Sequence, residues 1–450
     1  MLLCAVLAAC KPTPTEDFVV NKSDGKLEDI IAAEPEPESD TVGFEADEST
    51  PGQTPLRPAQ EAPEPVPVTE VQWTDSFSVN AAMDRLDIVI DANVQVPESG
   101  TAPVYRIGFA APDAEETNRL LQIFFGDRQA YLASHEKTKS YYKAQMERYI
   151  AEKEKAAEAW ERDEYDLLLG IANEKYAKAP DDPPLTVWDG SLDEKLDLMA
   201  ENEDGSRRYM SASEVSIYYR NAPEDPDVDS PDVKRAVPEN EAEQAAVEAG
   251  ERFLNALGID AEVASIQSTN DMIRSFGALH IEGYQVYFAP KYGGLPVTDL
   301  RTFHGFDGAA DAAGGSNEPE YSIQYEQETI GMLVSSGGEV VRFRHMRPSR
   351  ILKTENAAAK LLPFSEVQEL FKKYIGKVMF LHKGEPLKLT VHTVRLTMRR
   401  YPVKDSQTEL YLLPCWEFVA AVESGIPSID ATLETVCVLR INALDGSMMQ

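Results

Sequence analysis

Residues 411–418 read Tyr411-Leu-Leu-Pro-Cys-Trp-Glu-Phe418, and a second apolar run, Thr435-Val-Cys-Val-Leu439, follows near the C-terminus. Short apolar runs of this kind are typical of buried strands. The first run contains Cys415 and the second contains Cys437. If the strands are neighbours, the two cysteines could lie side by side and form a disulfide in an exported protein. The alternative is that both are small buried hydrophobic residues.

The two runs belong to the second of two similar stretches in the C-terminal half of the chain. In the first stretch, a predicted helix over 239–257 with Gly258 as its C-cap precedes strand candidates at 262–274, 283–290 and 329–344. In the second, a predicted helix over 365–374, capped by Gly376, precedes strand candidates at 387–401, 409–422 and 435 to the terminus. Each last strand is interrupted by a glycine turn.

We therefore predict a duplication, in which Glu239–Arg344 and Ser365–Met449 superpose as two modules. In each module one amphipathic helix covers the apolar face of an antiparallel sheet. The helix of the first module would bury Phe253 and Leu257, and the helix of the second would bury Leu370 and Phe371.

A helix on a short antiparallel sheet that ends in a strand–glycine unit, here Val438-Leu-Arg-Ile-Asn-Ala-Leu-Asp-Gly446, resembles PepSY domains and the related YycH/YycI regulator domains. Tyr287-Phe-Ala-Pro-Lys-Tyr-Gly-Gly-Leu-Pro-Val297 and residues 411–418 resemble central strands of that family. The whole layout is similar to an uncharacterised lipoprotein family of gut Firmicutes. The resemblance covers residues 235–450, and it implies extracytoplasmic binding or regulation without chemistry of its own.

The N-terminal ten residues are apolar and end in Leu7-Ala-Ala-Cys10, which resembles the lipobox of bacterial lipoproteins. The resemblance implies that Cys10 carries a diacylglyceryl group, whose two chains would hold the protein at the extracytoplasmic face of the cell membrane. No Lys or Arg precedes the apolar run, which is at the short limit for a secretory signal.

Composition divides the chain into five predicted segments. The signal, residues 1–10, precedes an acidic, Pro-rich tether over 11–70 that has few apolar side chains to bury and is therefore expected to be disordered. Residues 73–235 form an N-terminal α+β domain with a long helix or helical hairpin at 128–178 packed on its sheet. Residues 236–350 and 351–450 are the first and second PepSY-like modules. The predicted fold class is α+β, with antiparallel sheets each covered by helices.

Charge and motifs exclude several functions. The formal net charge is -34, so the chain repels phosphate backbones and nucleic-acid binding is not expected. The six histidines form no His-Glu-x-x-His motif, and no serine stands in a Gly-x-Ser-x-Gly sequence. His280, His304 and His345 could converge only through the fold. The sequence predicts no catalytic residue, metal or cofactor.

Aromatic residues in predicted strands offer the remaining candidate site. Tyr284, Tyr287, Tyr292 and Trp416 would either fill the core or line a binding surface, where aromatic side chains act as anchors. The sequence thus favours a membrane-anchored, non-catalytic protein that binds or regulates an envelope protein or peptide. The alternative is a lipoprotein that binds a carbohydrate or another small ligand, and a hydrolase is less favoured.

Overall fold

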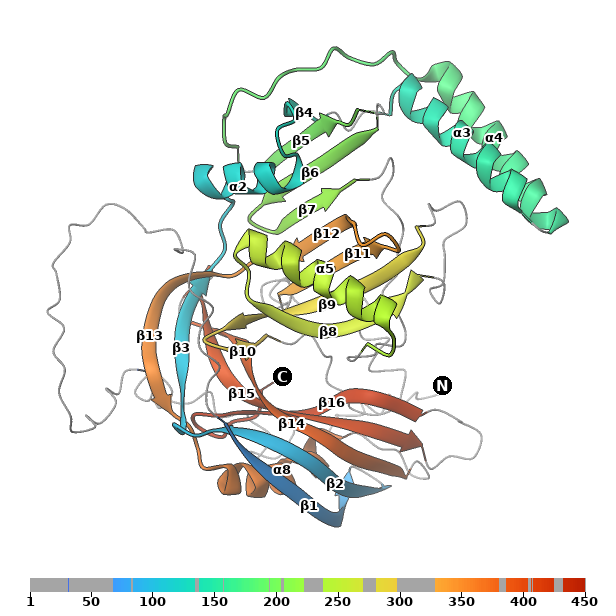
Figure 1. Ribbon diagram of the computed structural model, residues 1–450. Coiled ribbons are helices and arrows are strands. Elements are labelled where there is room, and N and C mark those ends of the chain that lie inside the picture. Colours follow the sequence, from blue (N-terminus) through green and yellow to red (C-terminus); the bar gives the residue numbers. More distant parts are fainter. Residues whose placement is uncertain are drawn as a thin grey trace, which may run out of the picture.

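A computed structural model gives the fold of the chain. The structure describes Ile31 and residues 68–81, 84–133, 137–156, 158–193, 195–203, 206–221, 238–269, 281–297, 328–379, 386–403, 406, 408–424 and 432–449. These residues form a mixed α+β fold with two sheets, which confirms the predicted α+β class (Figure 1). No helix among them is both long enough and apolar enough to cross a membrane.

The first sheet is called the composite sheet here because its strands come from both ends of the described chain. Its described strands are β1 (Val68–Ala81), β2 (Asp84–Pro97), β3 (Thr101–Gly108), β13 (Arg350–Lys360), β14 (Leu387–Pro402), β15 (Leu410–Ser424) and β16 (Thr432–Asn442). They are ordered β1-β2-β14-β15-β3-β13, with β16 paired to β15. The β2–β14 pair is parallel, and the other pairs are antiparallel. Helix α8 (Phe364–Val378) covers one face.

The second sheet, the inserted sheet, lies between β3 and β13 in the chain. Its described strands are β4 (Tyr131–Leu132), β5 (Lys195–Glu201), β6 (Arg207–Ser213), β7 (Ser216–Arg220), β8 (Ala261–Ser268), β9 (Gly283–Tyr292), β10 (Leu295–Pro296), β11 (Thr329–Ser335) and β12 (Val340–Met346). Its helices are α2 (Ala114–Phe124) and α5 (Glu241–Leu257), and a hairpin of α3 (Lys139–Lys155) and α4 (Ala159–Lys178) extends from it (Figure 1).

The predicted domain boundaries are corrected by this topology. Strands β1–β3 do not form an N-terminal domain with residues up to 235, because β2 pairs with β14 and β3 pairs with β13 and β15. The apolar face of β2 is covered by the same helix that covers the C-terminal strands. Trp73 on β1 completes that core, with its ring centroid 5.6 Å from that of Phe371 and 6.2 Å from that of Phe418.

Helix α8 lies where the sequence predicts a helix, but it ends later than predicted. Gly376 lies inside the helix and is not its cap, because α8 continues to Val378. The glycine has a packing role instead: a Cβ atom at this position would come within 3.0 Å of the Asn80 carbonyl oxygen on β1. Phe371, on the face of α8 that meets the sheet, is fully buried, and Leu370 is half-buried against the same core.

Helix α5 covers the inserted sheet in the same manner. Asn240 caps its N-terminus by accepting a hydrogen bond from the Glu243 amide, and Gly258 ends it in the left-handed conformation with φ of 72°. Leu257 is buried and Phe253 is half-buried against the sheet. A helix across antiparallel strands is therefore confirmed in both C-terminal stretches, although the sheet under α8 also contains the parallel β2–β14 pair. The close superposition of the two stretches stays a prediction.

The predicted tether is corrected at one point. Ile31, which lies in the middle of the 11–70 segment, is 4% exposed and belongs to the core of the composite sheet. Its carbonyl oxygen accepts a hydrogen bond of 3.2 Å from the side-chain amide of Asn356 on β13. Ile31, which stands between Ile30 and Ala32 in the sequence, therefore packs with the folded head. The rest of residues 11–67 lies outside the described residues.

Candidate functional site

The four aromatic candidates do not form one surface. Trp416 is 1% exposed in the composite-sheet core, and its ring centroid lies 5.1 Å from that of Phe364. Tyr284 packs with the α5 core of the inserted sheet. Tyr292 is 5% exposed in a third cluster between the sheets. Tyr287 is half-buried and lines a small pocket beside Phe288. Of the two alternatives, the structure supports core packing for Trp416, Tyr284 and Tyr292, which belong to three separate cores.

The two cysteines are free thiols in the structure. The register of β15 and β16 places Cys415 opposite Asn442 and Cys437 opposite Val419, so neither cysteine is the cross-strand partner of the other. The disulfide alternative is corrected, and the cysteines are small buried residues. Burial raises the pKa of both thiols to about 12, so both are protonated and unreactive at neutral pH.

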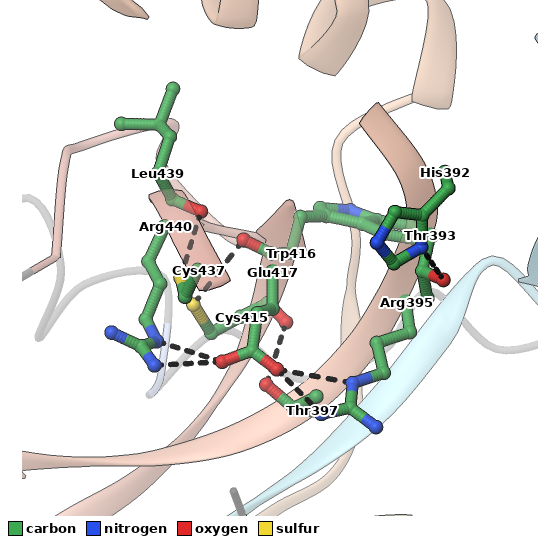
Figure 2. A network of polar contacts seen from close by, with 10 residues as sticks. All are labelled: His392, Thr393, Arg395, Thr397, Cys415, Trp416, Glu417, Cys437, Leu439 and Arg440. Atoms are coloured by element: carbon green, nitrogen blue, oxygen red, sulfur yellow. Dashed lines mark hydrogen bonds and ion pairs between the residues drawn. The ribbon is translucent and has the colours of Figure 1, made fainter. Parts of the chain in front are cut away.

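A buried ion triad lies beside these cysteines (Figure 2). Its centre is Glu417 on β15, which the register places between Arg395 on β14 and Arg440 on β16. Arg440 donates to Oε1 of Glu417 through Nε at 3.0 Å and through a terminal nitrogen at 2.8 Å. Arg395 donates to Oε2 in the same way, at 3.0 and 2.9 Å. The side chains of Glu417 and Arg440 are both 0% exposed, whereas that of Arg395, the outer member of the triad, is 35% exposed.

The chemistry of the triad is that of a fixed structural group. Four donated N–H bonds occupy both carboxylate oxygens and match the ionised form, so Glu417 is not poised as a general acid or base. Burial and the charge of Arg440 lower the pKa of nearby Arg399 to about 10. The thiols are protonated, so they supply no nucleophile. We therefore assign no reaction to this site.

A second buried network joins the two sheets around Glu328. His345 on β12 lies 2.6 Å from Oε1 of Glu328, and the Tyr292 hydroxyl donates to Oε2 at 2.7 Å. Arg400 on β14 reaches the same carboxylate at 3.5 Å. It also donates to the Arg347 carbonyl and the Ser349 hydroxyl, where the chain crosses between the sheets.

The electrostatics of this network favour a fixed contact between the two sheets. Burial alone would raise the pKa of Glu328, but the hydrogen bond and charge of His345, together with Arg400, lower it below its ordinary value. Burial and the charge of Glu328 raise the pKa of Tyr292 well above its ordinary value, so that its hydroxyl stays a donor. His345 is thus part of the contact between the inserted sheet and the composite sheet. His280 and His304 lie outside the described residues, and within those described no group of three or more His, Cys, Asp or Glu side chains is suited to hold a metal.

The α3–α4 hairpin is the feature that the sequence did not identify as a surface. The prediction packed residues 128–178, which include Trp160, on a sheet. In the structure the two helices pack chiefly on each other, and the hairpin stands apart from both sheets in Figure 1. Trp160 is 61% exposed, and Leu167 and Ile171 on the same helix are 63% and 42% exposed. The spacing of these three residues in the sequence was the signal that could have revealed the surface.

The base of the hairpin is held by polar contacts. Lys139 forms an ion pair of 2.7 Å with Asp181, and the Ser140 hydroxyl donates to Asp182 at 2.6 Å. Further out, Lys153 on α3 pairs with Asp166 on α4 at 2.5 Å, and the ring of Tyr149 lies 6.3 Å from that of Tyr165. These contacts link the two helices to each other and leave the stripe on α4 exposed.

The fold and these sites define a mixed α+β protein with a projecting helical hairpin and two buried ion networks. No protein-family model matches the chain, and no curated protein matches it. A solved structure similar to it is the crystal structure of an uncharacterised protein from Eubacterium rectale ATCC 33656. The TM-score is 0.42 at 9% identity, over 81% of this chain and 90% of that chain. A likeness at this level carries no statement about function.

Proposed function

We propose that the protein is a lipoprotein anchored by Cys10 at the extracytoplasmic face of the membrane, and that it binds a protein or peptide partner without catalysing a reaction. The observation that supports partner binding is the α3–α4 hairpin, whose exposed Trp160, Leu167 and Ile171 have no described element packed over them. A large exposed apolar patch on a soluble domain is typical of an interaction site. The lipid anchor is supported by the lipobox-like Leu7-Ala-Ala-Cys10.

The alternative of a carbohydrate or other small ligand receives less support. Such sites are concave and combine apolar walls with a few convergent polar groups. The four aromatic candidates are spread over separate parts of the fold, and the small pocket beside Tyr287 is narrow. The buried carboxylates of Glu417 and Glu328 are occupied by arginine and histidine partners, which gives no support to a hydrolase.

Partner binding is tested by site-specific photo-cross-linking in intact cells that express the full chain with a complete signal. A photoreactive residue at Ile171 should yield one saturable adduct, and Leu167→Asp in the same chain should abolish it. Leu352 on β13 is 51% exposed and serves as the control position, where we expect no such adduct. Equal cross-linking from both positions, or none from Ile171, would contradict the proposal.

The anchor is tested separately by Cys10→Ser. We expect this variant to leave the membrane fraction, because the acyl chains are the proposed attachment. If it stays with the membrane after a carbonate wash, the lipid-anchor proposal is wrong, whereas the hairpin result is unaffected.

A further inference from the structure

The exposed apolar residues of α4 form a straight stripe. Trp160, Leu167 and Ile171 are separated by seven and four residues, and at about 100° per residue they lie within about 20° of a common line. The stripe is about 16 Å long at 1.5 Å per residue. A tryptophan at one end adds a large, rigid anchor of the kind that dominates binding energy. This shape complements the apolar face of another helix, whose apolar residues recur at the same spacings.

The charges beside the stripe are acidic. Between Trp160 and Ile171 the charged residues within about 60° of the stripe are Asp163 and Glu164. The basic residues Lys175 and Lys178 follow only beyond Ile171. Asp166, on another face, is paired with Lys153. The chain as a whole has a formal net charge of -34, so its long-range field also favours a basic partner.

We propose that this stripe is the docking surface for an amphipathic helix of another protein, whose apolar face is flanked by Lys or Arg. The inference rests on the proposed function, which it deepens by naming the chemistry of the partner. A second copy of the chain fits less well, because like charges placed opposite each other across an interface oppose association. The apolar residues provide affinity, and the negative charges of Asp163 and Glu164 select a partner whose helix carries positive charge.

The inference is tested with the full chain, made with Cys10→Ser, and two probe peptides. One probe is a model amphipathic helix of Leu and Lys, and the other has Glu in place of each Lys. Trp160 supplies the readout, because it is exposed, whereas Trp73 and Trp416 are buried and Trp188 is half-buried against the core of the inserted sheet. We expect the Leu–Lys peptide to shift the tryptophan emission to shorter wavelength and to bind in a calorimetric titration. The Leu–Glu peptide should do neither.

Two variants separate docking on the stripe from general attraction to an acidic chain. Leu167→Asp adds negative charge and removes an apolar contact. It should therefore lower the affinity for the Leu–Lys peptide about tenfold or more, the scale of a hot-spot residue. Leu352→Asp adds the same charge on β13 and should leave binding unchanged. The double variant Asp163→Lys with Glu164→Lys should lower the affinity for the Leu–Lys peptide and allow the Leu–Glu peptide to bind. Far-UV circular dichroism checks that each variant stays folded.

Three outcomes would contradict the inference. If both Asp variants bind the Leu–Lys peptide as well as the unmodified chain does, the attraction is non-specific and the docking inference fails. Self-association that Leu167→Asp abolishes would make a second copy the occupant and would also overturn it. If Ile171 cross-links to a partner in cells but the probes show no discrimination by charge, the basic-helix inference fails and the proposed function stands.

Discussion

Glu417 shows what a single buried residue contributes to this protein. Its two arginine partners are its cross-strand neighbours, so the alignment of three strands depends on one carboxylate. Burying such a triad costs about as much desolvation energy as the attraction returns, but removing one member leaves a buried charge without compensation. The triad therefore favours one strand register more than it adds stability.

Glu417→Gln should lower the free energy of unfolding by about 3–5 kcal/mol, because Arg440 would keep a buried charge with no anion beside it. The control is Asp87→Asn, which removes the exposed partner of Arg85 and should cost at most about 1 kcal/mol. Denaturant unfolding followed by circular dichroism compares the two variants. Equal midpoints would show that the buried triad does not act as argued.

The cysteines predict a dependence of stability on pH. Burial raises the pKa of Cys415 and Cys437 to about 12, so the folded thiols keep their protons where unfolded thiols, with pKa near ~8.5, lose them. Above pH ~8.5 the unfolded state therefore binds fewer protons than the folded state. The contribution of the two thiols to the free energy of unfolding is complete below that pH and is lost as pH rises toward 12, at up to about 1.4 kcal/mol per pH unit for each thiol. The variant Cys415→Ser with Cys437→Ser should lose stability less steeply between about pH 9 and 10. Parallel pH curves for the two proteins would refute this.

At the scale of elements, α8 stabilises the composite sheet through one aromatic core. Phe371 is fully buried and stacks on Phe418, with ring centroids 4.6 Å apart. Phe371→Ala should destabilise the protein by about 3–5 kcal/mol, because it leaves a cavity where strands from both ends of the chain meet. Leu370→Ala, at a half-buried position, should cost less, and Leu352→Ala on the surface should cost little. Calorimetry gives the order, and a Phe371 variant no worse than the Leu352 variant would contradict it.

At the scale of the whole molecule, the composite sheet is discontinuous in sequence. Residues 350–450 alone lack β2, the parallel partner of β14, and they also lack Trp73. We expect them not to fold cooperatively. Gly108 and Arg350 are opposite each other in adjacent antiparallel strands, so a short hairpin turn can join residues 68–108 directly to 350–450. The joined protein should unfold in one thermal transition, whereas cooperative unfolding of residues 350–450 alone would contradict this account of the fold.

Local pattern in the sequence was sufficient for most elements and for the fold class. The alternation of Leu86, Ile88 and Ile90 predicts β2, and Gly258 predicts the end of α5, because these signals depend only on the residue and its near neighbours. The absence of a zinc or serine-hydrolase motif is also a local property. The Cys10 anchor stays a prediction, since it lies outside the described residues.

The partners of each strand could not be predicted from local sequence and are known from the folded structure. The pairing of β2 with β14 joins residues about three hundred positions apart, and no local pattern encodes that choice. The same holds for the partners of Glu417 and Glu328, which come from other strands. Trp160 and Trp416 are the same residue type, and each lies in a helix or strand. Trp160 is nevertheless exposed on the hairpin, whereas Trp416 is buried under α8. Burial is a property of the packed whole, because it depends on which surface covers a side chain and not on the side chain itself.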